Sequence, residues 1–172
     1  MDPTTTAGDY ADAATTGMYS RAATAGIFAY AYTAGDFAHA TTTGGYAHAT
    51  TTGRYACAAT TGRDADAATA GDFAHATTTG GYAYATTTGI SAHATTTGLR
   101  SNASVSGENA IAVAVGYDSC ARAADGGFIV LAQYDGDTVV AVKTAQVGKD
   151  GIKPDTWYKL SPTGEFVEAE VG

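Results

Sequence analysis

Four histidines and two cysteines are the residues of this sequence best suited to chemistry. All six share one position of a nine-residue period: His39, His48, Cys57, His75, His93 and Cys120. Zinc prefers such ligands, and two histidines from units that stacked directly, such as His39 and His48, could bridge a metal ion. Two histidines without a third ligand form a weak site. We therefore expect a solvated outer face that holds no metal and no other cofactor.

The remaining polar residues do not form a catalytic pattern. No serine, cysteine or carboxylate pair has a general base at a useful spacing. The glycines open predicted strands at intervals of nine residues, so neither nucleotide-binding fingerprint applies. The aspartates do not follow the nonapeptide calcium pattern. These observations predict a protein that is not an enzyme.

Glycine marks the period that places these residues. The unit reads Gly, variable, aromatic, Ala, variable, Ala, Thr or Ala, Thr, Thr or Ala, as in residues 44–52. A fixed period of this length is typical of stacked coils rather than of a globular core. The glycine recurs thirteen times, at positions 8, 17, 26, 35, 44, 53, 62, 71, 80, 89, 98, 107 and 116.

Small residues alternate with variable ones inside the unit, which predicts a strand with its uniform face inward. Ala38, Ala40 and Thr42 form one such inward set. Nine extended residues reach only about 30 Å, so a single unit would enclose almost nothing, and we favour two units per coil. The fold class is therefore all-β: a β-solenoid of about thirteen nonapeptide repeats over residues 8–124, after a lead-in at residues 1–7.

The composition changes after the repeats, in residues 125–172. Short strands are expected at residues 128–134, 138–147, 156–160 and 165–171, separated by Asp-Gly and Gly-rich turns. An open-ended solenoid needs its last coil covered, because unpaired backbone invites end-to-end assembly. From Gly107 onward, large apolar residues also enter the outward positions, which indicates that the solenoid is being covered. We interpret the tail as an antiparallel β cap or oligomerisation module.

The interior of alanine, threonine and glycine buries little apolar surface per residue, which predicts a homo-oligomer, either a dimer or a trimer. Aromatic side chains at the third position of the unit would point outward and stack as a ladder. Such an apolar stripe usually marks an interface. The predicted binding residues are Tyr10, Tyr19, Phe28, Phe37, Tyr46, Tyr55, Phe73 and Tyr82.

The net charge of −8 argues against direct binding to nucleic acid or to anionic lipid. No run of residues is long and apolar enough to span a membrane. Cys57 and Cys120 lie seven full repeats apart, so we expect two free thiols, as in a reducing cytoplasm. A second predicted binding surface, which could mimic DNA phosphates, is the acidic tail: Asp135, Asp137, Asp150, Asp155, Glu165, Glu168 and Glu170.

Two resemblances add to this interpretation. Residues 108–119, which read Glu-Asn-Ala-Ile-Ala-Val-Ala-Val-Gly-Tyr-Asp-Ser, resemble the head repeats of trimeric autotransporter adhesins. The Ala-His-Ala-Thr-Thr-Thr-Gly repeats, followed by residues 127–132 and 152–160, more closely resemble uncharacterised proteins of bacteriophages and prophages. The first resemblance implies a trimeric β-roll. The second implies a viral origin without an established activity.

Several functions remain open on these observations. The protein could be a structural solenoid that packs against its own copies or another virion protein. It could instead be a soluble inhibitor, of the anti-CRISPR or anti-restriction type, that blocks a host nuclease by protein binding. Adhesion is a further alternative. Rows of threonine also suggest ice binding, although alanine interrupts them at seven positions: Ala14, Ala23, Ala25, Ala34, Ala59, Ala68 and Ala70.

Overall fold

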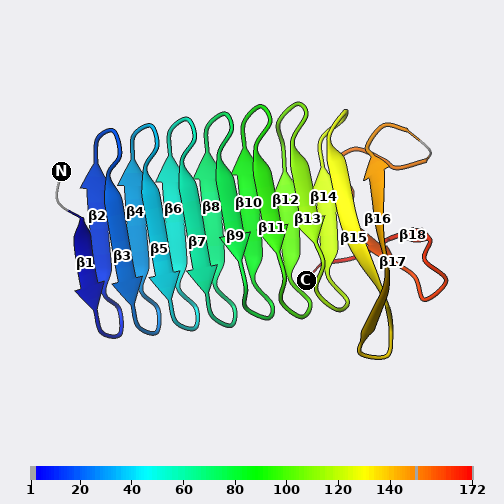
Figure 1. Cartoon of the computed structure of the whole chain (residues 1–172), viewed down its shortest axis with the longest axis horizontal. Coiled ribbons are helices and arrows are strands. Elements are labelled where there is room, and N and C mark those ends of the chain that lie inside the picture. Colours follow the sequence, from blue (N-terminus) through cyan, green and yellow to red (C-terminus); the bar gives the residue numbers. More distant parts are fainter. Residues whose placement is uncertain (1–2, 150, 172) are drawn as a thin grey trace.

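The computed structural model describes residues 3–149 and 151–171 and shows a β-solenoid built from two stacked nine-stranded sheets (Figure 1). The all-β prediction is confirmed, since the described residues contain no helix. The first sheet, sheet A, contains β1 (Thr4–Ala7), β3 (Arg21–Ala25), β5 (His39–Thr43), β7 (Cys57–Thr61), β9 (His75–Thr78), β11 (His93–Thr96), β13 (Ile111–Ala114), β15 (Phe128–Asp135) and β16 (Thr138–Gln146).

The second sheet, sheet B, contains the strands that alternate with these along the chain. They are β2 (Asp12–Thr16), β4 (Tyr30–Ala34), β6 (His48–Thr52), β8 (Asp66–Ala70), β10 (Tyr84–Thr88), β12 (Asn102–Val105), β14 (Cys120–Ala123), β17 (Tyr158–Leu160) and β18 (Phe166–Glu168). Each coil therefore crosses both sheets once.

Two nine-residue units make one coil, as the reach of the unit predicted. Parallel partners from β1 to β14 are 18 residues apart, as in Thr4 opposite Ala22 and Ala31 opposite Ala49, and those of β13 and β15 are 17 apart. The chain from Thr4 to Ala7 already belongs to sheet A, so part of the expected lead-in supplies the first strand.

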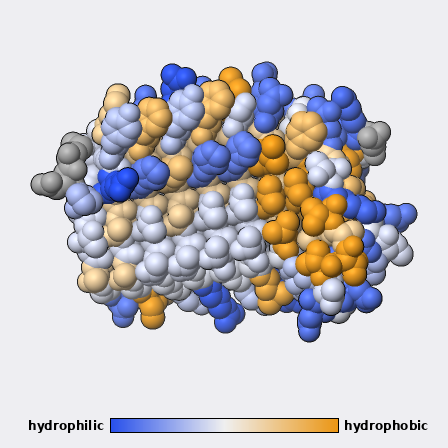
Figure 2. Space-filling view, viewed as in Figure 1, coloured by the Kyte–Doolittle hydropathy of each residue, from blue (hydrophilic) through white to orange (hydrophobic). Residues whose placement is uncertain are grey.

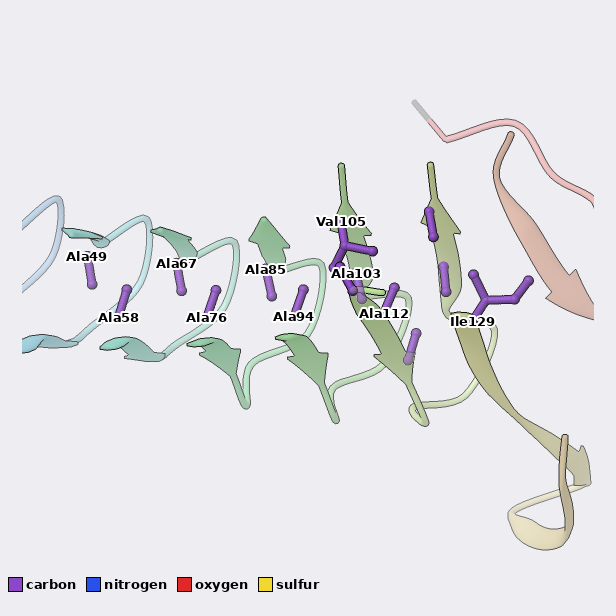
Figure 3. Packing of buried hydrophobic residues seen from close by; sticks show 14 of the residues in the cluster. Ala49, Ala58, Ala67, Ala76, Ala85, Ala94, Ala103, Val105, Ala112 and Ile129 are labelled. Atoms are coloured by element: carbon purple, nitrogen blue, oxygen red, sulfur yellow. The ribbon is translucent and has the colours of Figure 1, made fainter. Parts of the chain in front are cut away.

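Alanine and threonine fill the interior between the sheets. Alanines at the sixth unit position, such as Ala49 and Ala58, point from the two sheets toward each other (Figure 3). The threonines at the eighth position are buried beside them, and the alanine at the fourth position is buried in the turn. Because these side chains are small, the two sheets lie close together, with little apolar volume between them.

The turns depend on the glycine that opens each unit. Gly44 has a φ of +144°, and a Cβ added to it would overlap the carbonyl oxygen of Gly26 in the preceding coil. Glycine is the one residue that meets both demands. The third unit position is also left-handed, with φ near +56° at Phe28 and Tyr46. The aromatic residues therefore lie in turns, and not on strands as the alternation suggested.

The C-terminal strands close the two sheets differently. Strand β15 continues sheet A in parallel with β13, and β16 then pairs antiparallel with β15. In sheet B, β17 and β18 pair antiparallel beyond β14. Among the described residues, the larger buried side chains begin at β12 and continue into the tail, namely Val105, Ile129, Leu131, Val147, Ile152 and Tyr158.

We predict that Gly44→Ala lowers the free energy of unfolding by about 2–4 kcal/mol, because the new Cβ meets the Gly26 carbonyl and the left-handed φ is strained. The neighbouring Gly45→Ala is the matched control, since its Cβ would lie 3.6 Å from the Arg63 carbonyl oxygen. Thermal unfolding followed by circular dichroism measures both. Equal effects of the two substitutions would contradict this account of the turn.

The buried threonine column generates a second prediction. Ten of these threonine hydroxyls, five in each sheet and including that of Thr51, have no hydrogen-bond partner among the described residues. Valine has the same shape without the hydroxyl, and Val105 already occupies the column opposite Thr87. Removing an unpaired buried hydroxyl stabilises a protein by about 1 kcal/mol or more.

We therefore expect Thr51→Val to raise the melting temperature by about 2–4 °C. The outward-facing Thr50→Val, on the same strand, should change it little. A melting temperature lowered by Thr51→Val would mean that the hydroxyl is bonded in solution.

Candidate interaction surfaces

The two-unit coil divides the histidines and cysteines between two opposite faces. His39, Cys57, His75 and His93 lie on consecutive strands of sheet A and are register partners in that order. His48 and Cys120 lie on sheet B. Direct stacking of His39 on His48, which a one-unit coil would allow, therefore does not occur. Both cysteines are free thiols, as expected from their separation.

The histidine of sheet B belongs to a polar column that ties four coils together. The His48 ring stacks on Tyr30 with centroids 5.0 Å apart, and its Nδ1 lies 3.3 Å from Oδ2 of Asp66. The backbone N–H of Tyr84 donates to Oδ1 of Asp66 at 3.2 Å. Burial raises the pKa of the Asp66 carboxyl, and the nearby His48 partly opposes that shift. Each group already has a partner, so this column acts as a clamp between coils.

The aromatic residues form two ladders, not the single stripe that the sequence suggested. One runs along the turns that precede the odd-numbered strands and joins Tyr19, Phe37, Tyr55 and Phe73, with centroids 5.0–5.1 Å apart. The other lies on the opposite edge and joins Tyr10, Phe28 and Tyr46 at 5.0–5.2 Å. Tyr82 is on this second edge, where Arg63 lies 5.2 Å from its ring and Arg100 donates to its hydroxyl at 3.5 Å.

Stacking covers the faces of most rings in these ladders. Phe37, for example, has one ring stacked on each face, Tyr19 and Tyr55, and so presents its rim to solvent. Parallel rings at this spacing stabilise one another by about 0.5–1.5 kcal/mol per pair. The ladders therefore act first as supports between coils.

The acidic tail does not form one continuous surface. Asp135 and Asp137 flank the tip of the β15–β16 hairpin, while Glu168 lies on β18 and pairs with Lys153 at 2.6 Å. The backbone N–H of Asp155 donates to the Ala123 carbonyl, so this residue forms a turn against the last coil. Glu165 and Glu170 are exposed, and Asp150 lies outside the described residues.

A cavity of about 440 Å³ lies between this tail and the edge of sheet B. Its charges are paired: Asp118 accepts from Lys159 at 2.9 Å and lies 3.4 Å from Arg100. Burial raises the pKa of the adjoining Cys120 thiol, and Lys159 partly offsets the shift. The thiol is therefore not activated as a nucleophile.

Large apolar side chains gather on the outer face of sheet A at its C-terminal end (Figure 2). Ile111 is the register partner of Phe128, and Val113 of Val130, so these four form two rows. On β16 these two rows continue into Gln146 and Thr144, and Val142 lies opposite Ala132. The exposed Val139 and Val140 lie next to it, at the bulge in β16. We call this set the apolar platform: Ile111, Val113, Phe128, Val130, Val139, Val140 and Val142.

The tail covers sheet B and leaves the platform uncovered. Trp157 lies over Arg122, with the guanidinium 4.8 Å from its ring, on the outer face of sheet B. On sheet A, by contrast, Val139, Val140 and Val142 are 49–57 % exposed. The apolar positions that follow Gly107 on this face, Ile111 and Val113, are half-buried, as is Thr95 on the preceding strand. Consecutive nine-residue units belong to opposite sheets. Assigning alternate units to different sheets could therefore have distinguished the two faces from the sequence.

Comparison with known proteins finds no family model, no curated protein and no solved structure that matches the chain. Within the described residues, no three histidine, cysteine or acidic side chains are arranged to hold a metal ion. The part of the chain that the structure describes also has no helix long and apolar enough to cross a membrane.

The role of the ladders can be tested at Phe37, which stacks between Tyr19 and Tyr55. Serine already occupies the same turn position at Ser91, with φ +53°, so Phe37→Ser removes the ring and keeps an acceptable backbone. We expect a loss of about 1–3 kcal/mol in the free energy of unfolding, from two lost ring pairs, and no change in oligomeric state.

Tyr82→Ser is the control, because Tyr82 has no ring neighbour in its column and should lose less stability. Calorimetry and light scattering on both variants measure stability and mass. A Phe37→Ser protein that kept its stability and lost its oligomeric state would assign the ladder to binding instead.

Proposed function

We propose that the chain is a non-enzymatic structural solenoid that assembles with a second copy of itself through the apolar platform. The observation that carries this proposal is the row of large apolar side chains on an uncovered sheet face, where the preceding coils present only threonine, alanine and polar residues. Exposed apolar areas of this kind, rimmed by polar residues, mark interaction sites.

The edge strand β16 supports a second copy as the occupant. It ends sheet A, and no strand among the described residues pairs with its outer edge. Natural edge strands are usually protected by inward charges, by proline or by short length. This strand is nine residues long. Its one charged residue, Lys143, lies opposite the buried Leu131 and is an inward charge of this protective kind, and a β-bulge interrupts its pairing with β15. The platform side of the strand carries no charge.

Pairing between the β16 strands of two copies would cover the apolar platform and the unpaired edge of β16 together. An antiparallel pair related by a two-fold axis presents the same surface from each copy, as symmetric dimers require. It would extend sheet A across the interface and bring two platforms side by side. The small-residue interior adds a reason, because the chain buries few large side chains on its own.

The alternative of an inhibitor that mimics DNA has less support. Its acidic residues are divided between a hairpin tip and the β17–β18 region, and Lys153 neutralises Glu168. A viral setting, which the sequence resemblance implies, fits an assembling solenoid as a component of phage particles. Under this proposal the protein is found in purified particles in assembled form.

The assembly is tested by Val140→Asp combined with Val142→Asp. We expect the unaltered protein to have twice the mass of one chain by light scattering, and the double variant to have the mass of a single chain. The reason is that two carboxylates would have to be buried without partners at the interface.

Thr41→Asp is the control, since it places a charge on the outer face of the same sheet, three coils or more from the platform. This variant should remain a dimer. A single-chain mass for the unaltered protein, or a dimeric double variant, would contradict the proposal.

A further inference from the structure

The sheet A column that begins at His39 concentrates most of the metal-binding side chains of the chain. Four of the six histidines and cysteines in the sequence recur here at intervals of one coil: His39, Cys57, His75 and His93. We propose that His39, Cys57 and His75 bind a divalent transition-metal ion of the zinc type on this face, with the cysteine in the middle. This site is independent of the apolar platform, which lies on later coils.

The order of the three residues suits their lengths. Cys57 is the register partner of His39 on one side and of His75 on the other, and all three side chains point outward. An ion bound about 2.3 Å beyond the cysteine sulfur would lie above β7. The two imidazoles belong to strands about 4.8 Å away on either side, a distance that a histidine side chain can span. The fourth tetrahedral position then faces solvent and takes water.

The order of residues also decides against other sets in the column. A set with cysteine at one end, such as Cys57, His75 and His93, would require the short thiol to reach an ion across a whole strand. The site with cysteine in the middle places each histidine on an adjacent strand. Histidine and thiolate together favour zinc and related ions over calcium or magnesium.

The side chains must rotate for the ion to bind. The His75 ring stacks on His93 with centroids 5.0 Å apart and an interplanar angle of 25°, so it leaves this contact when it turns toward Cys57. His39 is exposed and free to turn, and the Cys57 thiol makes only a long contact of 4.0 Å with the Tyr55 carbonyl.

The charges around the column set the strength of the site. Arg21 precedes His39 in the column and opposes a cation, and no carboxylate occupies an outward position of the described sheet A strands from β3 to β13. On binding, the Cys57 S–H bond breaks, a sulfur–metal bond forms and the proton passes to solvent, with no change of oxidation state. Burial raises the pKa of this thiol, so the ion must displace a firmly held proton.

Cobalt(II) titration of the full chain in the presence of a phosphine reductant tests the proposal. We expect a thiolate-to-cobalt charge-transfer band in the near ultraviolet that saturates at one equivalent and disappears when zinc is added. Cys57→Ser should abolish the band. His39→Ala and His75→Ala should each weaken cobalt binding by at least about tenfold, the loss expected when even a supporting residue of a metal site is removed.

Three matched variants complete the experiment. Cys120→Ser removes the other thiol, and His48→Ala removes the histidine of the opposite sheet, so both should keep the band. His93→Ala should bind cobalt as well as the unaltered chain or better, since it frees His75 from its stacking partner. The proposal is overturned by a missing band in the unaltered chain, by a band that survives Cys57→Ser, or by a greater loss in His93→Ala than in His39→Ala.

Discussion

The close approach of glycine backbones between successive coils is the constraint on which the rest of this structure depends. At Gly26, Gly44 and Gly62, an added Cβ would overlap the carbonyl of the glycine 18 residues earlier. No side chain fits there, so every unit begins at the same point in its coil. All other positions are consequently brought into columns, and each column repeats one residue type or a small set of types.

The columns explain how a core of alanine and threonine can hold an ordered fold. Burial of small side chains contributes little, but each coil adds backbone hydrogen bonds, ring pairs and turn contacts to the preceding one. Asp36 illustrates the turn contacts, because its carboxylate accepts from the backbone N–H of Arg54 at 2.9 Å. The stability of such a solenoid is the sum of nearest-neighbour terms, so a change in one column affects mainly adjacent coils.

Much of this architecture could be predicted from the sequence, because the period and the reach of nine residues require stacked coils with two units each. The inward alanine and threonine positions follow from alternation. The turn conformation of the aromatic residues does not, since a left-handed aromatic residue is uncommon and its position continues the strand-like alternation. This left-handed conformation is stabilised by stacking on the ring 18 residues away, as Phe37 stacks on Tyr55. The sequence of a single unit does not reveal that contact.

The candidate sites depend on which sheet each nine-residue unit joins. The nine-residue pattern makes all units look alike, whereas the 18-residue coil places alternate units on opposite sheets. His39 and His75 share a sheet with Cys57, whereas His48 shares the other with Asp66. The same division separates the two ends of the tail, because β17 and β18 extend sheet B while β16 extends sheet A. An exposed apolar face beside an unpaired strand edge marks a candidate interface. Our proposal of a structural role by assembly rests on the way in which this chain ends sheet A.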